Sequence, residues 1–229
     1  MRFSTIKVAG ADALRVLDER RARYPETREY PFLIGDAEDL NHLKEYMEYF
    51  DGEAPRDPAT ILLAASNIDP AAWVEERRAE NEGNDYAIDE NFVGSWPDEE
   101  VEKVMIHLHQ DILTGEIHPE VYLGLAIVDE PWQLLAVLGY GDWNLCPPPE
   151  VHAAFHRAWF GKYGAEIVGV SNDVVECLVK SPPRDREAAM QLAREQYWYC
   201  PDIVEQGCGT ISRLAATLLD SPHWYFWWD

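Results

Sequence analysis

The sequence predicts a mixed α/β fold in which strands and helices alternate. Three observations support this. Short apolar runs bounded by turn residues recur along the chain, and segments with helical spacing of apolar residues separate them. The apolar content, 47% of 229 residues, is that of a globular protein with a substantial core. Alternation of the two element types favours a sheet with some parallel strand pairs.

The first 80 residues predict strands and helices in turn. Asp36 follows a short apolar run and can cap a helix, and Asp69-Pro70 is a typical helix start with Asp as the N-cap. Residues 60–65 are a short apolar run, which predicts a buried strand. The expected order is a strand at 3–8, a helix at 11–23, a strand at 30–34, a helix from 36, a strand at 60–65 and a helix at 70–80.

The second part predicts a different order of elements. Residues 103–109 alternate in polarity as a strand does, and residues 121–128 and 132–138 are apolar enough for strands. A helix after Pro147-Pro148-Pro149, a hairpin, two further helices and a last strand follow. Their expected ranges are 150–163, 166–170 with 174–180, 185–200, 210–219 and 224–228. From residue 132 on, this order resembles a split βαβ, ferredoxin-like unit with one extra helix.

These patterns predict two regions that pack into one compact body. The first, residues 1–100, alternates strands and helices and contains an acidic segment at 75–102. The second, residues 101–229, forms a C-terminal domain.

The balance of charge restricts the function. The chain holds 42 Asp and Glu residues against 19 Lys and Arg, a formal net charge of −23. A protein this acidic is repelled by nucleic-acid phosphates and by anionic membrane surfaces, so neither is an expected partner. The N-terminus has no apolar core of the signal-peptide type, and no apolar run is as long as a membrane span. With four cysteines and no export signal, we expect a cytoplasmic protein with reduced thiols.

Most of the acidic residues precede residue 131. Residues 1–130 hold 30 acidic and 12 basic side chains, and residues 75–102 hold 11 acidic and two basic ones. Fields of one sign attract partners of the opposite sign and raise association rates. The acidic segment therefore predicts a surface for a basic protein partner, although solubility alone is the other explanation. Its candidate binding residues are Glu75, Glu76, Asp98, Glu99 and Glu100.

Several uncommon residues occur in a fixed order in the C-terminal part. They are Gly141-Asp142-Trp143-Asn144-Leu145-Cys146-Pro147, Trp159, Tyr163-Gly164-Ala165-Glu166, Ser181-Pro182-Pro183, Glu195-Gln196-Tyr197, Tyr199-Cys200-Pro201-Asp202 and Trp224-Tyr225-Phe226-Trp227-Trp228-Asp229. The set resembles the bacterial family named domain of unknown function 4253, closely over about residues 121–229. A looser resemblance covers about residues 8–45, through Val8-Ala9-Gly10-Ala11-Asp12-Ala13-Leu14 and Tyr30-Pro31-Phe32-Leu33-Ile34-Gly35. The resemblance as a whole favours a bacterial, cytoplasmic protein and counts against a known enzyme class.

Two groups of histidines have spacings that metal sites use. His107 and His109 lie two residues apart on an expected strand face, and Asp111 or His118 can complete such a site. His152 and His156 lie four apart on what we expect to be the polar side of a helix. In both cases the alternative is a solvent-facing pair, and neither string is a complete metal motif, so we expect no cofactor.

A cysteine nucleophile is the other catalytic hypothesis. Cys146 precedes a helix, where a thiolate has a lowered pKa, and His152 or His156 can serve as its base. The alternative is a buried thiol that behaves as a small apolar residue. Asp202, after Tyr199-Cys200-Pro201, is a candidate acid or base, although Asp beside Pro more often caps a turn.

Three functions follow from these observations. The first is a protein-binding inhibitor, such as an immunity protein, that neutralises a basic partner such as a toxin. The second is a hydrolase that uses Cys146 with a histidine, or a metal at His107, His109 and Asp111. The third is a small-ligand-binding module built from the nine tryptophans, which more often form a core. The absence of a complete catalytic motif favours the first, non-enzymatic function.

Overall fold

A central sheet organises the chain. The computed structural model describes residues 2–53, 56–82 and 88–229, and within these residues six strands form one mixed sheet. Its spatial order is β1-β3-β2-β4-β5-β6. The strands are β1 (Phe3–Ala9), β2 (Glu29–Gly35), β3 (Glu120–Ile127), β4 (Ala165–Val170), β5 (Val174–Val179) and β6 (His223–Trp227). The predicted mixed α/β class is confirmed.

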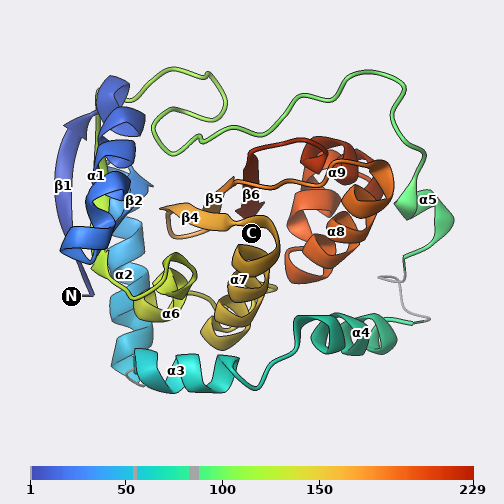
Figure 1. The fold of residues 1–229 in the computed structure, drawn as a ribbon, viewed down its shortest axis with the longest axis horizontal. Coiled ribbons are helices and arrows are strands. Elements are labelled where there is room, and N and C mark those ends of the chain that lie inside the picture. The colour runs from blue at the N-terminus through green and yellow to red at the C-terminus, as the bar shows by residue number, and fades with distance from the viewer. Residues whose placement is uncertain (1, 54–55, 83–87) are drawn as a thin grey trace.

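Helices cover both the sheet and its ends (Figure 1). The longer ones are α1 (Ala13–Thr27), α2 (Ala37–Glu53), α3 (Pro58–Ala65), α4 (Pro70–Glu80), α7 (Pro149–Tyr163), α8 (Arg186–Tyr199) and α9 (Ile211–Leu218). Shorter helical turns are η1 (Gly10–Asp12), α5 (Glu90–Val93), η2 (Pro131–Gln133), α6 (Leu134–Leu138) and η3 (Ile203–Cys208). In the described part of the chain, no helix has the length and apolarity that crossing a membrane requires.

The pairing pattern joins the two halves of the chain. β3 lies between β1 and β2 and is antiparallel to both, so the N-terminal strands share a sheet with the C-terminal ones. β2 pairs with β4 in parallel, through Leu33 and Gly169, and the β4–β5 and β5–β6 pairs are antiparallel. It follows that β1, β2, β4 and β6 all point in the same direction.

The hydrophobic core has a layer on each face of the sheet. One layer packs α2, α7, α8 and α9 against the sheet and contains Trp159, Trp224, Phe226 and Trp228. The other packs α1 against β2 and β3, and Ile106 of the segment before β3 belongs to it. Four of the nine tryptophans, Trp159, Trp198, Trp224 and Trp228, are buried in the first layer, and Trp73, Trp96 and Trp143 pack against it partly buried. Core packing is the structural alternative that the sequence favoured.

Three predicted strands are wrong. Residues 60–65 belong to helix α3, because Pro58 opens it and the Asp57 side chain caps it by accepting from the Thr60 N–H. Residues 132–138 form η2 and α6, which begin with Pro131 and a capping box between Glu130 and Gln133. Residues 103–107 have no regular secondary structure and residues 108 and 109 lie in a turn, so this segment does not join the sheet. A buried side chain, Glu176 of β5, accepts the His107 N–H where a strand would supply a carbonyl.

The ferredoxin-like strand order is also not found. In that arrangement the first strand of the unit lies between the third and the last, and here the residues expected to form that first strand, 132–138, are helical. Here β2, from the N-terminal region, occupies the position beside β4, and β6 joins the outer side of β5.

A glycine in β3 allows the core ring of Phe32 to lie close to the sheet. A Cβ at Gly124 would lie 2.2 Å from Phe32 Cζ, which packs edge-on against Phe3. Gly124→Ala is therefore expected to lower the free energy of unfolding, measured by urea denaturation, by about 1–3 kcal/mol. Gly161→Ala is the matched control. A Cβ at this exposed helical position has open space, so we expect a gain of about 0.5–1 kcal/mol. Equal effects of the two changes would contradict the steric argument.

Candidate functional site

A cleft opens where the parallel strands β2, β4 and β6 end. In open α/β sheets, ligand sites form at this edge, where the connections of neighbouring strands diverge. After β2 the chain enters α2, whereas after β4 it makes the tight turn to β5. The cleft between these connections has a volume of about 520 Å³. Its polar and aromatic lining includes Asp36, Glu38, Asp39, His42, His107, Asp111, His118, Asp173, Tyr225 and Trp227.

Two of these carboxylates are fixed by the start of α2. Asp36 Oδ1 accepts the N–H groups of Glu38 and Asp39, and Asp39 Oδ2 accepts the N–H of Asp36 at 3.0 Å. Gly35 has a φ of 117°, and a Cβ there would lie 2.0 Å from Asp39 Oδ2, so glycine is required. Burial raises the pKa of Asp39, and the negative charges of Asp36 and Asp173 raise it further. The cleft thus concentrates negative charge.

The opposite wall of the cleft is a small hairpin formed by residues 107–118. The His118 N–H donates to the His109 carbonyl at 3.1 Å, and Gln110 forms a bridge with Ile117. Asp111 Oδ1 accepts the N–H groups of Leu113 and Thr114, which closes the turn. In Figure 1 this hairpin is the yellow-green loop at the top, beyond the green segment that comes from α5.

The predicted metal residues are only partly brought together. His107 and Asp111 line the cleft with His118, but His109 is not part of its lining. His107 Nδ1 lies 3.0 Å from Gln110 Nε2, and burial lowers the pKa of both His107 and His109. Asp111 uses its carboxylate to close the turn. Across the residues that the structure describes, no group of three or more His, Cys, Asp or Glu side chains is arranged to hold a metal ion.

Exposed apolar side chains lie in the turn and on the second arm of the same hairpin. Leu113 is 92% exposed, Ile112 is 59% exposed and Ile117 is 51% exposed. None of the three belongs to a core layer. We did not single out these residues from the sequence. The available signal was a pair of large apolar residues, Ile112-Leu113, inside a turn between Asp111 and Gly115.

The acidic residues predicted to bind a partner lie elsewhere and are all exposed. Glu75 and Glu76 are on α4, and Glu75 is paired with Arg78 at 2.6 Å. Asp98, Glu99 and Glu100 follow α5, and Glu99 is paired with Arg213 at 2.9 Å. Figure 1 shows α4 at the lower right and the chain after α5 rising to the top, so the two groups are separate. Residues 83–87 of the acidic segment lie outside the described residues.

A cluster of four polar side chains, Cys146, His152, His156 and Tyr199, is enclosed in the core, apart from the cleft. Cys146 Sγ lies 3.3 Å from His152 Nε2, and the Tyr199 hydroxyl lies 2.5 Å from His152 Nδ1 and 3.0 Å from His156 Nε2. His152 and His156 are both 0% exposed, so the expected position on the polar side of the helix is wrong. Because α7 packs against the sheet and also against α3 and α6, its polar residues are buried too.

The Tyr199 hydroxyl has one proton to share between the two histidines, so it donates to one ring and accepts from the other. His156 Nδ1 has no hydrogen-bond partner among the described residues. Burial holds the pKa of His152 well below its usual value and lowers that of His156 to about 3. Both rings are therefore neutral.

The candidate nucleophile, Cys146, and the candidate acid, Asp202, are both buried in the fold. Cys146 is 4% exposed, and burial raises the pKa of its thiol far above the usual value, which opposes thiolate formation. Asp202 is buried beside the end of the chain. Its Oδ2 accepts the Asp229 N–H at 3.1 Å, and its Oδ1 accepts from Gln206 Nε2 at 3.1 Å. The structure brings Cys146 to a histidine but encloses both.

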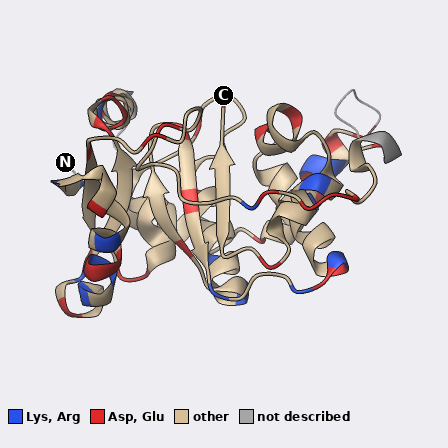
Figure 2. Cartoon of the chain, turned by 90° about the horizontal axis from the view of Figure 1, so that it is seen from above, with Lys and Arg blue, Asp and Glu red and all other residues tan. Residues whose placement is uncertain are grey.

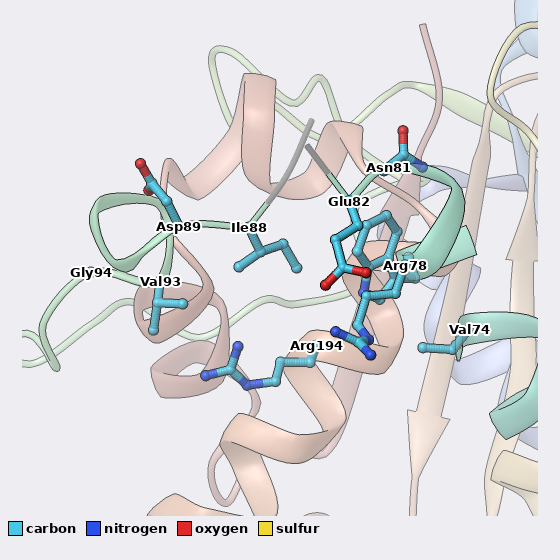
Figure 3. A pocket seen from close by; sticks show the side chains of 10 residues that line it. Val74, Arg78, Asn81, Glu82, Ile88, Asp89, Val93, Gly94 and Arg194 are labelled. Atoms are coloured by element: carbon cyan, nitrogen blue, oxygen red, sulfur yellow. The ribbon is translucent and has the colours of Figure 1, made fainter. Parts of the chain in front are cut away.

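A larger cavity of about 710 Å³ lies between α4, α5 and α8. Figure 3 shows Arg194 of α8 extending into it, with Arg78 and Glu82 on the far side. Its lining carries both signs of charge, Arg78 and Arg194 with Glu82 and Asp89, and also includes Trp198. The mixed charge gives this cavity no preference for a cationic or an anionic ligand.

Comparisons with known proteins bear on the C-terminal part of the chain. Residues 122–229 match the family model described as Domain of unknown function (DUF4253). The searches of curated proteins and of solved structures found no match. The looser resemblance over residues 8–45 stays a prediction. The region from β3 to the C-terminus, which supplies β4, β5, β6 and the aromatic floor of the cleft, therefore resembles the DUF4253 family, as its residue pattern predicts.

Proposed function

We propose that this protein binds and inhibits a basic partner protein, as an immunity protein neutralises a toxin. The observation that carries the proposal is the composition of the cleft at the end of β2, β4 and β6. It holds five carboxylate side chains, and among the described residues that line it none is Lys or Arg. A concave surface with a single sign of charge attracts partners of the opposite sign and orients them as they approach.

The rest of the molecule adds to this attraction. The net charge is −23, and Figure 2 shows acidic positions distributed over the helices and connections, with fewer basic ones. Many of the basic side chains are already paired with carboxylates, including Lys7 with Glu120 and Arg28 with Asp129. A basic protein would therefore be drawn from any direction and held where negative charge is concentrated in a cleft.

The proposal is tested by affinity capture of the tagged protein from a lysate of its native host. Binding at about 50 mM salt and stepwise elution towards about 500 mM reduces the Debye length several-fold, which weakens contacts between exposed charges. We expect one polypeptide rich in Lys and Arg, in stoichiometric amount, released by salt and identified by mass spectrometry. Failure to retain such a protein at any salt concentration would contradict the proposal.

A further inference from the structure

We propose that the partner docks on the tip of the 107–118 hairpin together with the rim of the cleft beside it. This inference rests on the proposed function and names the surface that performs it. We define the docking surface as Ile112 and Leu113 in the turn of the hairpin and Ile117 on its second arm, together called the tip, with Glu116 beside them in the sequence and Glu38 in the lining of the cleft. It does not include the acidic groups on α4 and after α5.

The apolar tip is the first reason. Single exposed apolar side chains are ordinary on protein surfaces, but three within six residues of one hairpin are not. Leu113 has the largest exposed fraction, 92%, of the large hydrophobic side chains that the structure describes. Large apolar side chains that reach a pocket on a partner are the usual centres of binding energy in protein interfaces.

The rigidity of the hairpin is the second reason. Its turn is closed by Asp111, its two arms are joined by the bond from His118 to His109, and its base is held by Glu176. None of these bonds uses the three tip side chains. A tip that is ordered before binding loses less conformational entropy when a partner covers it, so more of the contact energy contributes to affinity.

Charge complementarity identifies the occupant as a basic protein. Ile112 lines the cleft, so the tip adjoins Asp36, Asp39 and Asp173. An anionic membrane is repelled by this rim, and a second copy of the chain would bring a like net charge of −23 to the same place. The structure favours a protein that presents Lys or Arg side chains around an apolar depression.

The surface is tested first by photo-crosslinking in the native host. The photoreactive residue p-benzoylphenylalanine replaces Leu113 in one variant and Leu63 in a control, since Leu63 is 68% exposed on α3. We expect the Leu113 variant to form one adduct with a basic protein and the Leu63 variant to form none. Absence of an adduct at Leu113, the same adduct at Leu63, or an adduct with a second copy of the chain would overturn the assignment.

The second test measures affinity for the crosslinked protein with purified full-length variants. Leu113→Ser is expected to raise Kd about tenfold or more, as for a central interface residue, and Leu63→Ser to leave it unchanged. Glu38→Gln with Glu116→Gln should slow association and flatten its salt dependence. Glu75→Gln with Glu76→Gln removes the same amount of charge from α4, outside the docking surface. This double variant should leave the association rate and its salt dependence unchanged. The assignment is wrong if Leu113→Ser and Leu63→Ser raise Kd equally, or if the two double variants change the association rate equally.

These tests separate the two proposals. If affinity capture yields a basic partner but Leu113 forms no adduct, the docking surface is wrong and the proposed function remains. If both capture and crosslinking yield no basic protein, both proposals fail.

Discussion

Replacing Glu176 by glutamine is expected to raise the free energy of unfolding at pH 8 and to change it far less at pH 5. Glu176 is 0% exposed beneath the segment that leads into the docking hairpin, and burial raises the pKa of its carboxyl to about 8. Its Oε1 accepts the His107 N–H at 2.5 Å, whereas its Oε2 lies against Gly169 without a partner among the described residues. The fold therefore favours the protonated acid.

The sign of the pH dependence follows from this shift. The folded pKa, about 8, exceeds the ordinary 4.5, so the unfolded chain releases this proton first as the pH rises. The stability that the group contributes is complete below pH 4.5 and is lost as the pH rises towards 8. At about 1.4 kcal/mol per pKa unit, the loss amounts to as much as about 4 kcal/mol at pH 8. Glutamine has the shape of the neutral acid and does not ionise, so the variant avoids this loss.

The measurement is urea denaturation of both proteins at several pH values between 5 and 8. Glu166→Gln is the matched control, since Glu166 lies on the neighbouring strand β4 and is paired with Arg21 and Lys180. Those two cations outweigh burial and hold the pKa of Glu166 below its usual value. Its replacement should therefore lower the free energy of unfolding above pH 5. If the difference in free energy of unfolding between the Glu176 variant and the wild type stays constant with pH, Glu176 is not protonated in the fold.

Much of the fold could be predicted from local signals in the sequence. Asp69-Pro70 marks a helix start by the capping chemistry of Asp and the fixed φ of Pro, and α4 begins there. The alternation of Trp224, Phe226 and Trp228 with Tyr225 and Trp227 predicts which side of β6 is buried, and the burial follows it. The error at residues 60–65 has a local cause as well, because the capping Asp57-Pro58 lies just before the apolar run.

The remaining features depend on contacts between distant segments. The irregular segment 103–109 alternates as a strand does, yet it bonds to a side chain 69 positions further along the chain. The cleft is formed by the ends of β2, β4 and β6 with the hairpin, four segments that no sequence spacing relates. Hydrophobic periodicity also shows one apolar stripe on α7, whereas this helix is packed on several sides. The burial of His152 and His156 was therefore not predictable.

Tyr199→Phe is expected to be among the most destabilising changes that keep an aromatic ring in place. Phenylalanine preserves the packing of this fully buried ring against Trp159, Phe226 and Trp228 but removes the hydroxyl. His152 Nδ1 and His156 Nε2 then lose their shared hydrogen-bond partner in a site without solvent. Each unsatisfied buried group costs about 1–3 kcal/mol, so the free energy of unfolding should fall by about 2–5 kcal/mol.

Tyr140→Phe provides the matched comparison, because it removes a hydroxyl from an equally buried ring in the same core layer. The Tyr140 hydroxyl has no hydrogen-bond partner in the described part of the chain, so its removal should leave stability unchanged or raise it. Both variants lose one oxygen atom and gain no contact, so their difference in urea denaturation isolates the two histidine bonds. If both variants lose the same free energy of unfolding, the hydroxyl of Tyr199 stabilises the fold only by filling space and not through its histidine bonds. A loss confined to Tyr199→Phe would assign the buried Cys146, His152, Tyr199 and His156 cluster to the stability of the domain.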